Sequence, residues 1–519
     1  MPFVPGERGH RWLILAAMTG TLAMMMLDAT VVSVALPSIQ RDLDLTQTEL
    51  QWVVNAYLLA LAALVAVGGR LADMFNRVAV LIVGICLFAL ASAACGLADD
   101  EAAILLARAV QGAGAALMIP PTGAIVINTF PFEERGKAMG VYAGVSMLAL
   151  SLGPLVGGLF TEYVDWRWVF WVNLPVAAAT IGMVLWTRPP GEVERGQRLD
   201  WAGLATLVPG LAAVVLALMQ SNTWGWGSAS VLLLLGGGLL LLAVFVVIER
   251  RQPSPLVELG LFASRNFRGD SLVLFCVQFS LIALTVFGAI YVQDMLGFSP
   301  VEAGLGLLPL TIPLLLAAPI GGRIYDRAGP RALVSAGCLA AGAGLLWTAA
   351  VLHELAYGWL VPGYVALGVG IGLVMSPTST DAMGSAPAQL RGEASGMIQT
   401  VRQVGGTVGL AIVGAIVAGV QHDRLQDFLL GMGAPRSEID SVQRILAEDS
   451  GSQRQIAEQV PRAELHQVTE AAKDAAVDGI AAAYWVAGGV VVLAAVAAWA
   501  MLRRQVVAPP DGAAAAPAG

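Results

Sequence analysis

An acidic residue stands in the middle of the first apolar segment of the chain. Asp28 precedes Pro37 by nine residues, which places it ~13 Å inside a helix that rises ~1.5 Å per residue. A carboxylate at that depth in lipid costs at least about 2.5 kcal/mol, so it should face a water-filled cavity or a partner. A carboxylate balanced between desolvation and a nearby cation can take up and release a proton. Asp28 is therefore a candidate for proton coupling, with a structural polar contact as the alternative.

Arg108 is the natural partner of Asp28. It stands about seven residues into the fourth apolar segment, at a depth of ~10 Å from the same side of the membrane. The similar depths predict an ion pair between two helices that breaks on protonation or substrate binding, and a permanent structural pair is the alternative. Gln111 follows one turn deeper and can offer hydrogen bonds to a cavity.

The composition requires that lipid solvates most of the chain. Of the 519 residues, 57% are hydrophobic and 13% are charged, whereas soluble domains carry about 25% charged residues. Apolar runs of ~20 residues match the thickness of a bilayer, and the weakly alternating segments of a β-barrel are absent. We predict an all-α membrane protein with fourteen spans, near 12–37, 49–69, 78–98, 102–126, 136–160, 166–187, 200–220, 229–249, 270–292, 301–322, 331–352, 357–378, 395–419 and 481–503.

Charge and cysteine patterns set the topology and exclude a metal site. Arginines concentrate in one set of short loops, which by the positive-inside rule predicts that both termini are cytoplasmic. The four cysteines lie inside apolar runs and the four histidines are scattered. We therefore predict no metal and no cofactor, with the proton gradient as the energy source. The preference for Arg over Lys suggests a GC-rich bacterium, and hence its cytoplasmic membrane.

An internal repeat divides the chain into two six-helix halves. Gly69 to Asp73 returns as Gly322 to Asp326, and Arg135-Gly136 returns as Arg391-Gly392. Duplicated halves around a midplane site are a transporter architecture. The predicted units are an N-terminal bundle (1–190), two inserted helices with an amphipathic segment at 255–267 (191–269), a C-terminal bundle (270–505) and a disordered tail (506–519). Residues 420–479 are expected to form short amphipathic helices outside the membrane, as a solvated connector or as a gate.

Each copy of the repeat ends in an acid close to arginines. Asp73 precedes Arg77, and Asp326 precedes Arg327 and Arg331. A carboxylate at a helix end can bridge to the neighbouring helix and so hold one conformation. We predict two conformational latches, built on Gly69 and Gly322. Topogenic charge alone would explain the arginines but not the repeated Gly-x-x-x-Asp spacing.

The fifth span carries Gly153-Pro154-x-x-Gly157-Gly158. Proline removes a backbone hydrogen bond and glycines let a neighbouring helix approach closely, so this helix should be pliable and tightly packed. Polar, aromatic and thioether side chains on other spans are candidates for the substrate cavity, although most residues of these types in a bundle are packing. They are Met25, Asn55, Tyr57, Gln111, Gln278, Gln399 and Gln403.

These strings resemble the major facilitator superfamily, and in particular its fourteen-helix drug:proton antiporter branch of multidrug efflux transporters. Leu27 to Pro37 resembles the first-helix signature of that branch, and Arg108-x-x-Gln111-Gly112 resembles the motif linked to proton transfer. Gly153 to Gly158 resembles the exporter motif, and Trp166 to Pro175 is typical of the branch. In the first loop, Met74, Asn76 and Val78 depart from the usual base, glycine and base.

The resemblance implies a proton-coupled exporter of small lipophilic, often cationic, compounds. An importer or lipid transporter on the same fold remains an alternative. An integral membrane transferase is disfavoured, because the sequence has neither clustered acids for a metal-bound pyrophosphate nor a phosphate-binding loop. We expect no enzymatic activity, no nucleic-acid partner and a monomer that binds protons and substrate within the lipid bilayer.

Overall fold

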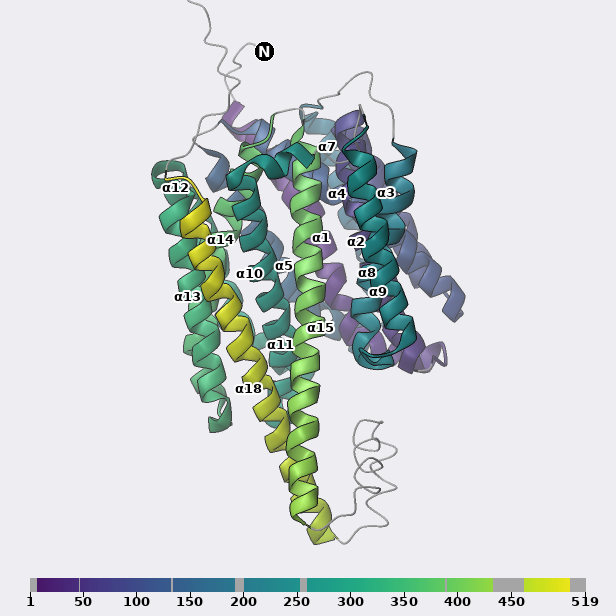
Figure 1. Ribbon diagram of the computed structural model, residues 1–519. Helices are drawn as coiled ribbons and strands as arrows, with labels where there is room; N and C mark the ends of the chain where they lie inside the picture. Colours follow the sequence, from purple (N-terminus) through teal and green to yellow (C-terminus); the bar gives the residue numbers. More distant parts are fainter. Residues whose placement is uncertain are drawn as a thin grey trace, which may run out of the picture.

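The computed structural model describes residues 7–45, 47–131, 134–191, 200–252, 259–387, 390–432 and 462–504. Within these ranges the regular structure is helical, and the long helices run side by side in a bundle (Figure 1). The N-terminal half holds α1 (Glu7–Asp42), α2 (Gln47–Met74), α3 (Arg77–Gly96), α4 (Glu101–Thr129), α5 (Arg135–Tyr163), α6 (Trp168–Trp171) and α7 (Asn173–Thr187). The inserted pair is α8 (Trp201–Trp224) and α9 (Ala229–Glu249).

The C-terminal half repeats this arrangement. It holds α10 (Arg265–Ile290), α11 (Pro300–Leu305), α12 (Leu308–Ala328), α13 (Pro330–Val351), α14 (Tyr357–Gly384), α15 (Arg391–Gly431) and α18 (Arg462–Met501). Short turns are η2 (Leu259–Ala263), η3 (Tyr291–Met295) and η4 (Leu352–Glu354). Thirteen segments of the described chain are long and apolar enough to span a membrane. The 29-residue α5 is a further long helix, so the predicted all-α membrane fold is confirmed.

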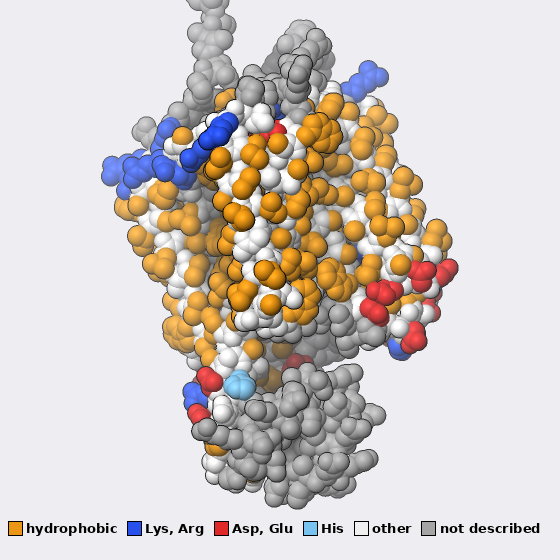
Figure 2. Space-filling view, turned by 45° about the vertical axis from the view of Figure 1, so that its right-hand side comes forward, with side chains coloured by type: hydrophobic (Ala, Val, Ile, Leu, Met, Phe, Trp, Pro, Cys, Tyr) orange, Lys and Arg blue, Asp and Glu red, His pale blue; other side chains and the backbone are white. Residues whose placement is uncertain are grey.

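The bundle has two polar ends separated by an apolar belt. We call the end where α1 begins and α18 ends the terminal face, and the other end the opposite face (Figure 1). Figure 2 shows hydrophobic side chains covering the belt, with basic side chains gathered at the terminal face and acidic ones at the opposite face. This distribution of charge and apolar surface fits a bilayer around the belt.

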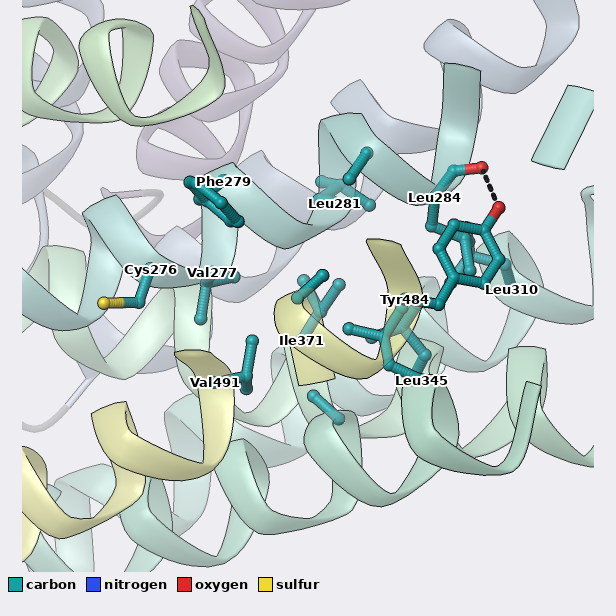
Figure 3. Close-up of a cluster of buried hydrophobic side chains, with 14 of the residues drawn as sticks. Cys276, Val277, Phe279, Leu281, Leu284, Leu310, Leu345, Ile371, Tyr484 and Val491 are labelled. Carbon is teal, nitrogen blue, oxygen red and sulfur yellow. Dashed lines mark hydrogen bonds between the residues drawn. The ribbon is translucent and has the colours of Figure 1, made fainter. Parts of the chain in front are cut away.

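The core of the C-terminal half is almost entirely apolar. Ile371, Leu345 and Val491 meet between α13, α14 and α18 (Figure 3). The hydroxyl of Tyr484 is fully buried and donates to the carbonyl of Leu284, across 3.3 Å, which pairs a polar atom that would otherwise be costly to bury. This contact ties α18 to α10.

The inserted helices pack against both halves. Leu207 and Leu211 of α8 lie with Phe245 of α9 against Ala66 of α2, and Met397 and Val404 of α15 join the same cluster. Helix α9 is mostly exposed, because only 17% of its most apolar stretch is buried inside the protein. Its surface therefore faces lipid. The pair thus covers the junction of α2 and α15, one helix from each half.

Two predicted segments differ in the structure. Residues 420–431 continue α15 and residues 462–479 belong to α18, so the prediction of separate short helices there is wrong. Leu425 and Leu429 pack against Val468 and Ala472, and this apolar contact lets both helices continue past the bundle (Figure 1). The described part of the predicted amphipathic segment, residues 259–267, forms the 3₁₀ turn η2 and the start of α10. Residues 433–461 and 505–519 lie outside the described residues.

Glycines set the closest contacts between the halves. A side-chain carbon added at Gly322 of α12 would overlap the carbonyl of Gly136 of α5, and the reverse also holds. On the other side of the interface between the halves, Gly396 of α15 lies against the backbone of Gly69 of α2. Small residues permit such backbone contact in membranes.

We predict that Gly322→Ala lowers the stability of the folded protein by about 1–3 kcal/mol, because the methyl group would push α12 away from α5. The melting temperature in detergent would report the loss. The matched control is Gly237→Ala on α9, where an added carbon meets nothing within 4 Å. Equal melting of the two variants would contradict a tight α5–α12 contact.

Candidate functional site

Asp28 lies at the centre of a buried polar network in the N-terminal half. Its Oδ2 accepts a hydrogen bond from Arg108 Nη1 at 2.8 Å, and its Oδ1 accepts from Gln111 Nε2 at 2.9 Å and Asn173 Nδ2 at 2.8 Å. None of these four side chains is more than 1% exposed. Helices α1, α4 and α7 therefore supply one acid and three donors to a single point, and the predicted Asp28–Arg108 ion pair is present.

Arg108 is held by more than its acid. Its Nε donates to the carbonyl of Val53 at 2.9 Å, and its guanidinium lies 4.5 Å from the ring centroid of Tyr57. The same Nη1 that contacts Asp28 also reaches Gln111 Oε1 at 2.8 Å. Carbonyl, ring and amide contacts partly replace the hydration of the guanidinium, so Arg108 retains partners if Asp28 becomes neutral.

Asn173 is the member of this network that the sequence analysis did not assign. Its Nδ2 also lies 3.0 Å from Ser92 Oγ, which in turn donates to the carbonyl of Phe170 at 2.8 Å. The sequence did contain one indication of this role, because Asn173 is an amide between Val172 and Leu174 in an otherwise apolar segment. Periodicity could not show that this side chain turns toward α1 rather than toward lipid.

The network makes proton binding and geometry interdependent. An ionised carboxylate accepts all three donors and carries the charge that pairs with Arg108, whereas a protonated carboxyl is neutral and has one lone pair fewer. The charge-assisted bond from Arg108 to Asp28 is then weakened. Protonation thus changes how α1 is held to α4 and α7, which is the physical requirement for coupling a proton to helix movement.

Two latches join the halves at the terminal face. Asp73 of α2 contacts Arg77 in an i,i+4 ion pair and accepts a hydrogen bond from the backbone N–H of Glu393, at the start of α15. Asp326 of α12 accepts from the backbone N–H of Gly136 at 3.1 Å, at the start of α5. Each acid thus meets the first turn of a helix in the other half, where unpaired N–H groups favour an anion.

The two latches differ in their basic residues. Arg70 pairs with Glu393 at 3.4 Å, both buried. Their counterparts in the repeat are Arg323, which is exposed, and Lys137, which lies over the ring of Trp12. The predicted bases of the second latch are elsewhere, because Arg327 is exposed and Arg331 stacks on Trp499 of α18 at 4.5 Å.

The unusual residues of the first loop have a structural role. Asn76 caps α3 by accepting from the N–H groups of Val78 and Ala79, at 2.9 and 3.2 Å. An amide side chain at this position satisfies two otherwise unpaired donors. The loop therefore keeps its shape without the glycine that the resemblance leads one to expect there.

The glycine string of the fifth span packs on the helix that carries Asp28. A side-chain carbon at Gly153 would overlap Thr30, and one at Gly157 would overlap the carbonyl of Val31. Thr30 Oγ1 also donates to the carbonyl of Leu150 at 2.8 Å. Gly158 is half-buried, and the side chain of Pro154 lies outside the described residues. The string therefore packs α5 against α1 next to Asp28.

A cavity lies between the halves, next to the network. It has about 680 Å³ of empty space, part of it open to solvent. Its wall combines thioethers with hydroxyl and amide groups from α1, α4, α5, α14 and α15. The lining residues are Leu22, Met26, Ile119, Gly123, Met139, Tyr142, Ala143, Ser146, Met375, Ser376, Ser379, Met383, Ser395, Ile398, Gln399 and Arg402. Flexible thioethers suit varied apolar shapes.

Arg402 is the charged residue of this cavity wall. Its Nη1 lies 3.2 Å from Gln399 Oε1 and its Nη2 lies 3.4 Å from Gln278 Oε1, while its Nε has no hydrogen-bond partner among the described residues. No carboxylate pairs with it in that part of the chain. Arg402 therefore gives the wall a positive charge that no described carboxylate neutralises.

The sequence of residues 18–410 matches the family model described as Major Facilitator Superfamily. This match spans more than half of the chain. The protein belongs to the Major Facilitator Superfamily.

Relatives within this superfamily include named export proteins. The tetracenomycin C resistance and export protein of Streptomyces glaucescens is 34% identical, with 83% of this chain and 80% of that protein aligned. The puromycin resistance protein pur8 of Streptomyces alboniger is 37% identical over 81% and 85%, respectively. The cephamycin export protein CmcT of Amycolatopsis lactamdurans is 35% identical over 75% and 82%.

Solved structures of the superfamily share the fold. The proton:xylose symporter XylE superposes with a TM-score of 0.62 at 14% identity, covering 95% of this chain and 96% of that one. The human organic anion transporter MFSD10 gives a TM-score of 0.60 at 13% identity, covering 95% and 100%. The family and the fold identify a multi-pass membrane transporter.

The predicted cavity residues of this superfamily member lie in four different surroundings. Gln399 lines the cavity and Gln278 contacts Arg402. Tyr57 and Gln111 belong to the network around Asp28 and Arg108, and Met25 is buried in the N-terminal core. Asn55 and Gln403 are half-buried and lie outside the lining.

The string from Trp166 to Pro175 also organises the opposite face. Trp166 Nε1 and Arg167 Nη1 contact Asp42 Oδ2 at 3.0 and 2.7 Å, at the end of α1. The hydrogen bond from Trp166, followed by that from Arg167, holds the pKa of Asp42 below its ordinary value. The same string therefore anchors α1 at its end through Trp166 and Arg167, and at its middle through Asn173.

We predict that Asn173→Ala raises the pH at which substrate-dependent proton flux is half-maximal, because the ionised form of Asp28 loses one of its three donors. The variant should also lose about 1–3 kcal/mol of stability, since Ser92 loses a partner too. Flux against pH in liposomes and melting temperature are the measurements. The control is Asn55→Ala, because Asn55 is half-buried and its amide makes no hydrogen bond among the described residues. Identical pH profiles for the two variants would contradict a positioning role for Asn173.

Proposed function

We propose that this protein is a proton-coupled exporter of small lipophilic compounds across the bacterial cytoplasmic membrane. The observation that carries the proposal is the buried Asp28 with its donors Arg108, Gln111 and Asn173. Asp28 lies two residues along α1 from Met26, and Met26 lines the cavity. A proton arriving at Asp28 therefore changes the support of a helix that forms part of the cavity wall.

The named relatives support export as the direction of transport. The tetracenomycin C, puromycin and cephamycin proteins are described as resistance or export proteins. The close packing of Gly153 and Gly157 on α1 is consistent with the exporter motif of the resemblance. The latches complement this assignment, because they close the terminal face around backbone donors of the opposite half.

The topology follows from the distribution of charge. Basic side chains gather at the terminal face (Figure 2), and by the positive-inside rule this face is cytoplasmic, with both termini on that side. We further propose that residues 1–190 and 270–505 move against each other, that residues 191–269 travel beside α2 and α15, and that one chain is the functional unit. No cofactor is required, because the proton gradient supplies the energy.

The substrate should carry oxygen acceptors as well as apolar surface. The positive charge of Arg402, which no described carboxylate neutralises, favours carbonyl, phenolate or carboxylate groups. The resemblance suggested cationic compounds, but a cation in this cavity would meet a like charge. We therefore propose neutral or acidic lipophilic substrates, held by the methionines and oriented by Arg402.

We predict that Asp28→Asn abolishes substrate-dependent proton flux in liposomes that contain a pH dye and carry an imposed proton gradient. Because this variant leaves Arg108 buried without its counter-charge, it should also lose about 3–5 kcal/mol of stability. The control is Asp28→Asn combined with Arg108→Gln, which removes both charges. The double variant should recover stability but not proton flux. Substrate-dependent proton flux that survives in either variant would place the coupling proton elsewhere, and substrate movement indifferent to the gradient would contradict antiport.

We predict that Arg402→Gln lowers transport of acidic lipophilic compounds about 10- to 100-fold relative to neutral ones, the range expected for ~1.5–3 kcal/mol per hydrogen bond to a charged group. Competition between an acidic and a neutral dye in the same vesicles measures the ratio. Arg331→Gln is the matched control, because Arg331 stacks on Trp499 outside the cavity. An unchanged ratio in Arg402→Gln would rule out a recognition role.

A further inference from the structure

A second group of buried acids lies in the C-terminal half, near the terminal face. Asp381 of α14 accepts hydrogen bonds from Asn266 Nδ2 of α10 at 2.8 Å and from the Tyr325 hydroxyl of α12 at 2.9 Å. Asp270 of α10 lies one turn from Asn266 and its carboxyl contacts that of Asp381. The group belongs neither to the Asp28 network nor to the cavity wall.

This group is short of hydrogen-bond donors. Asp270 is fully buried, and neither of its carboxyl oxygens has a partner among the described residues. Asn266 Oδ1 is also buried without a donor. Buried acceptors without donors cost about 1–3 kcal/mol each, and more when charged. Asn266 and Asp270, one turn apart on α10, together hold three such atoms, and the described side chains supply no hydrogen for them.

Charged groups nearby do not remove this deficit. Asp326 follows Tyr325 on α12 and is itself acidic, and Asn266 and Tyr325 already donate to Asp381. Arg503 acts electrostatically on Asp381, but it is exposed after the end of α18, and among the described residues no salt bridge joins the two. Two adjacent carboxylates in such a site cannot both remain ionised. A single proton between them satisfies both the charge and the missing donor.

We propose that Asp270 and Asp381 form a second proton-binding site, in which Asp270 carries the proton and donates it to Asp381. Asp381 is the member that remains ionised, because its two oxygens already accept from an amide and a phenol. The proton comes from water at the terminal face. The site concerns proton binding by this chain and holds for export or import alike, so its test does not depend on transport.

The position of the site gives the proton a structural consequence. Tyr325 is adjacent in sequence to Asp326, the acid that latches α12 to the first turn of α5. Loss of the proton would leave two like charges in contact between α10 and α14, and these helices would have to separate or admit water. Tyr325 would follow Asp381, so the second latch responds to protons that never reach Asp28.

Infrared spectroscopy of the full-length protein in detergent tests the proposal without any substrate. At neutral pH the wild-type protein should show the C=O stretching band of one protonated carboxyl per molecule that is absent from both Asp270→Asn and Asp270→Ala. In each variant Asp381 keeps its two donors and stays ionised. Asp28→Asn and Glu249→Gln, which change buried acids elsewhere, should keep the band.

The test needs only one folded Asp270 variant, because both variants remove the same carboxyl. A monodisperse peak on size-exclusion chromatography shows that a variant is folded. If neither folds, the band must still persist in both Asp28→Asn and Glu249→Gln, and its loss in either variant would overturn the proposal. Absence of a protonated-carboxyl band at neutral pH would overturn the proposal. So would a band that appears only when sodium is replaced by choline, since a bound metal cation would then fill the site.

Discussion

The cost of placing a charge in lipid governs this structure. Asp28 lies too deep along α1 to reach water at either face, so neighbouring helices must provide what water would have provided. Helices α4 and α7 do so with a guanidinium and two amides, and α2 in turn holds the guanidinium through a carbonyl and a tyrosine ring. Four helices are therefore arranged around the requirements of one carboxylate, and its charge is linked to their packing.

Glycine makes the rest of the mechanism possible. Contacts at Gly136 and Gly322, and at Gly153 and Gly157, bring backbones together more closely than any side chain allows. Backbone contact of this kind holds the helices together without interlocking side chains. The acids of the latches add a directional element, because each binds the backbone N–H groups of a helix start and gives up that contact as a unit.

The halves share a backbone plan but have diverged in charge. The N-terminal half buries an acid with donors, whereas the C-terminal half buries a pair of acids with too few donors and a cavity arginine without an acid. The first latch contains an attractive Arg70–Glu393 pair. The second latch has two basic residues, Arg323 and Lys137, at the equivalent positions. Duplication supplied the geometry, and later substitution gave each half separate chemistry.

The sequence alone determined what depends on distance along a helix. Span length, the repeat, and the matching depths of Asp28 and Arg108 all follow from a fixed rise per residue, and each agrees with the structure. The structure decided what depends on rotation about a helix axis and on the choice of neighbour. Asn173 turns toward Asp28, Arg402 toward the cavity, and Asp326 toward Gly136 rather than its own arginines. The lengths of α15 and α18 likewise depend on an apolar contact between them, because packing against a distant segment, rather than local periodicity, sets where such helices end.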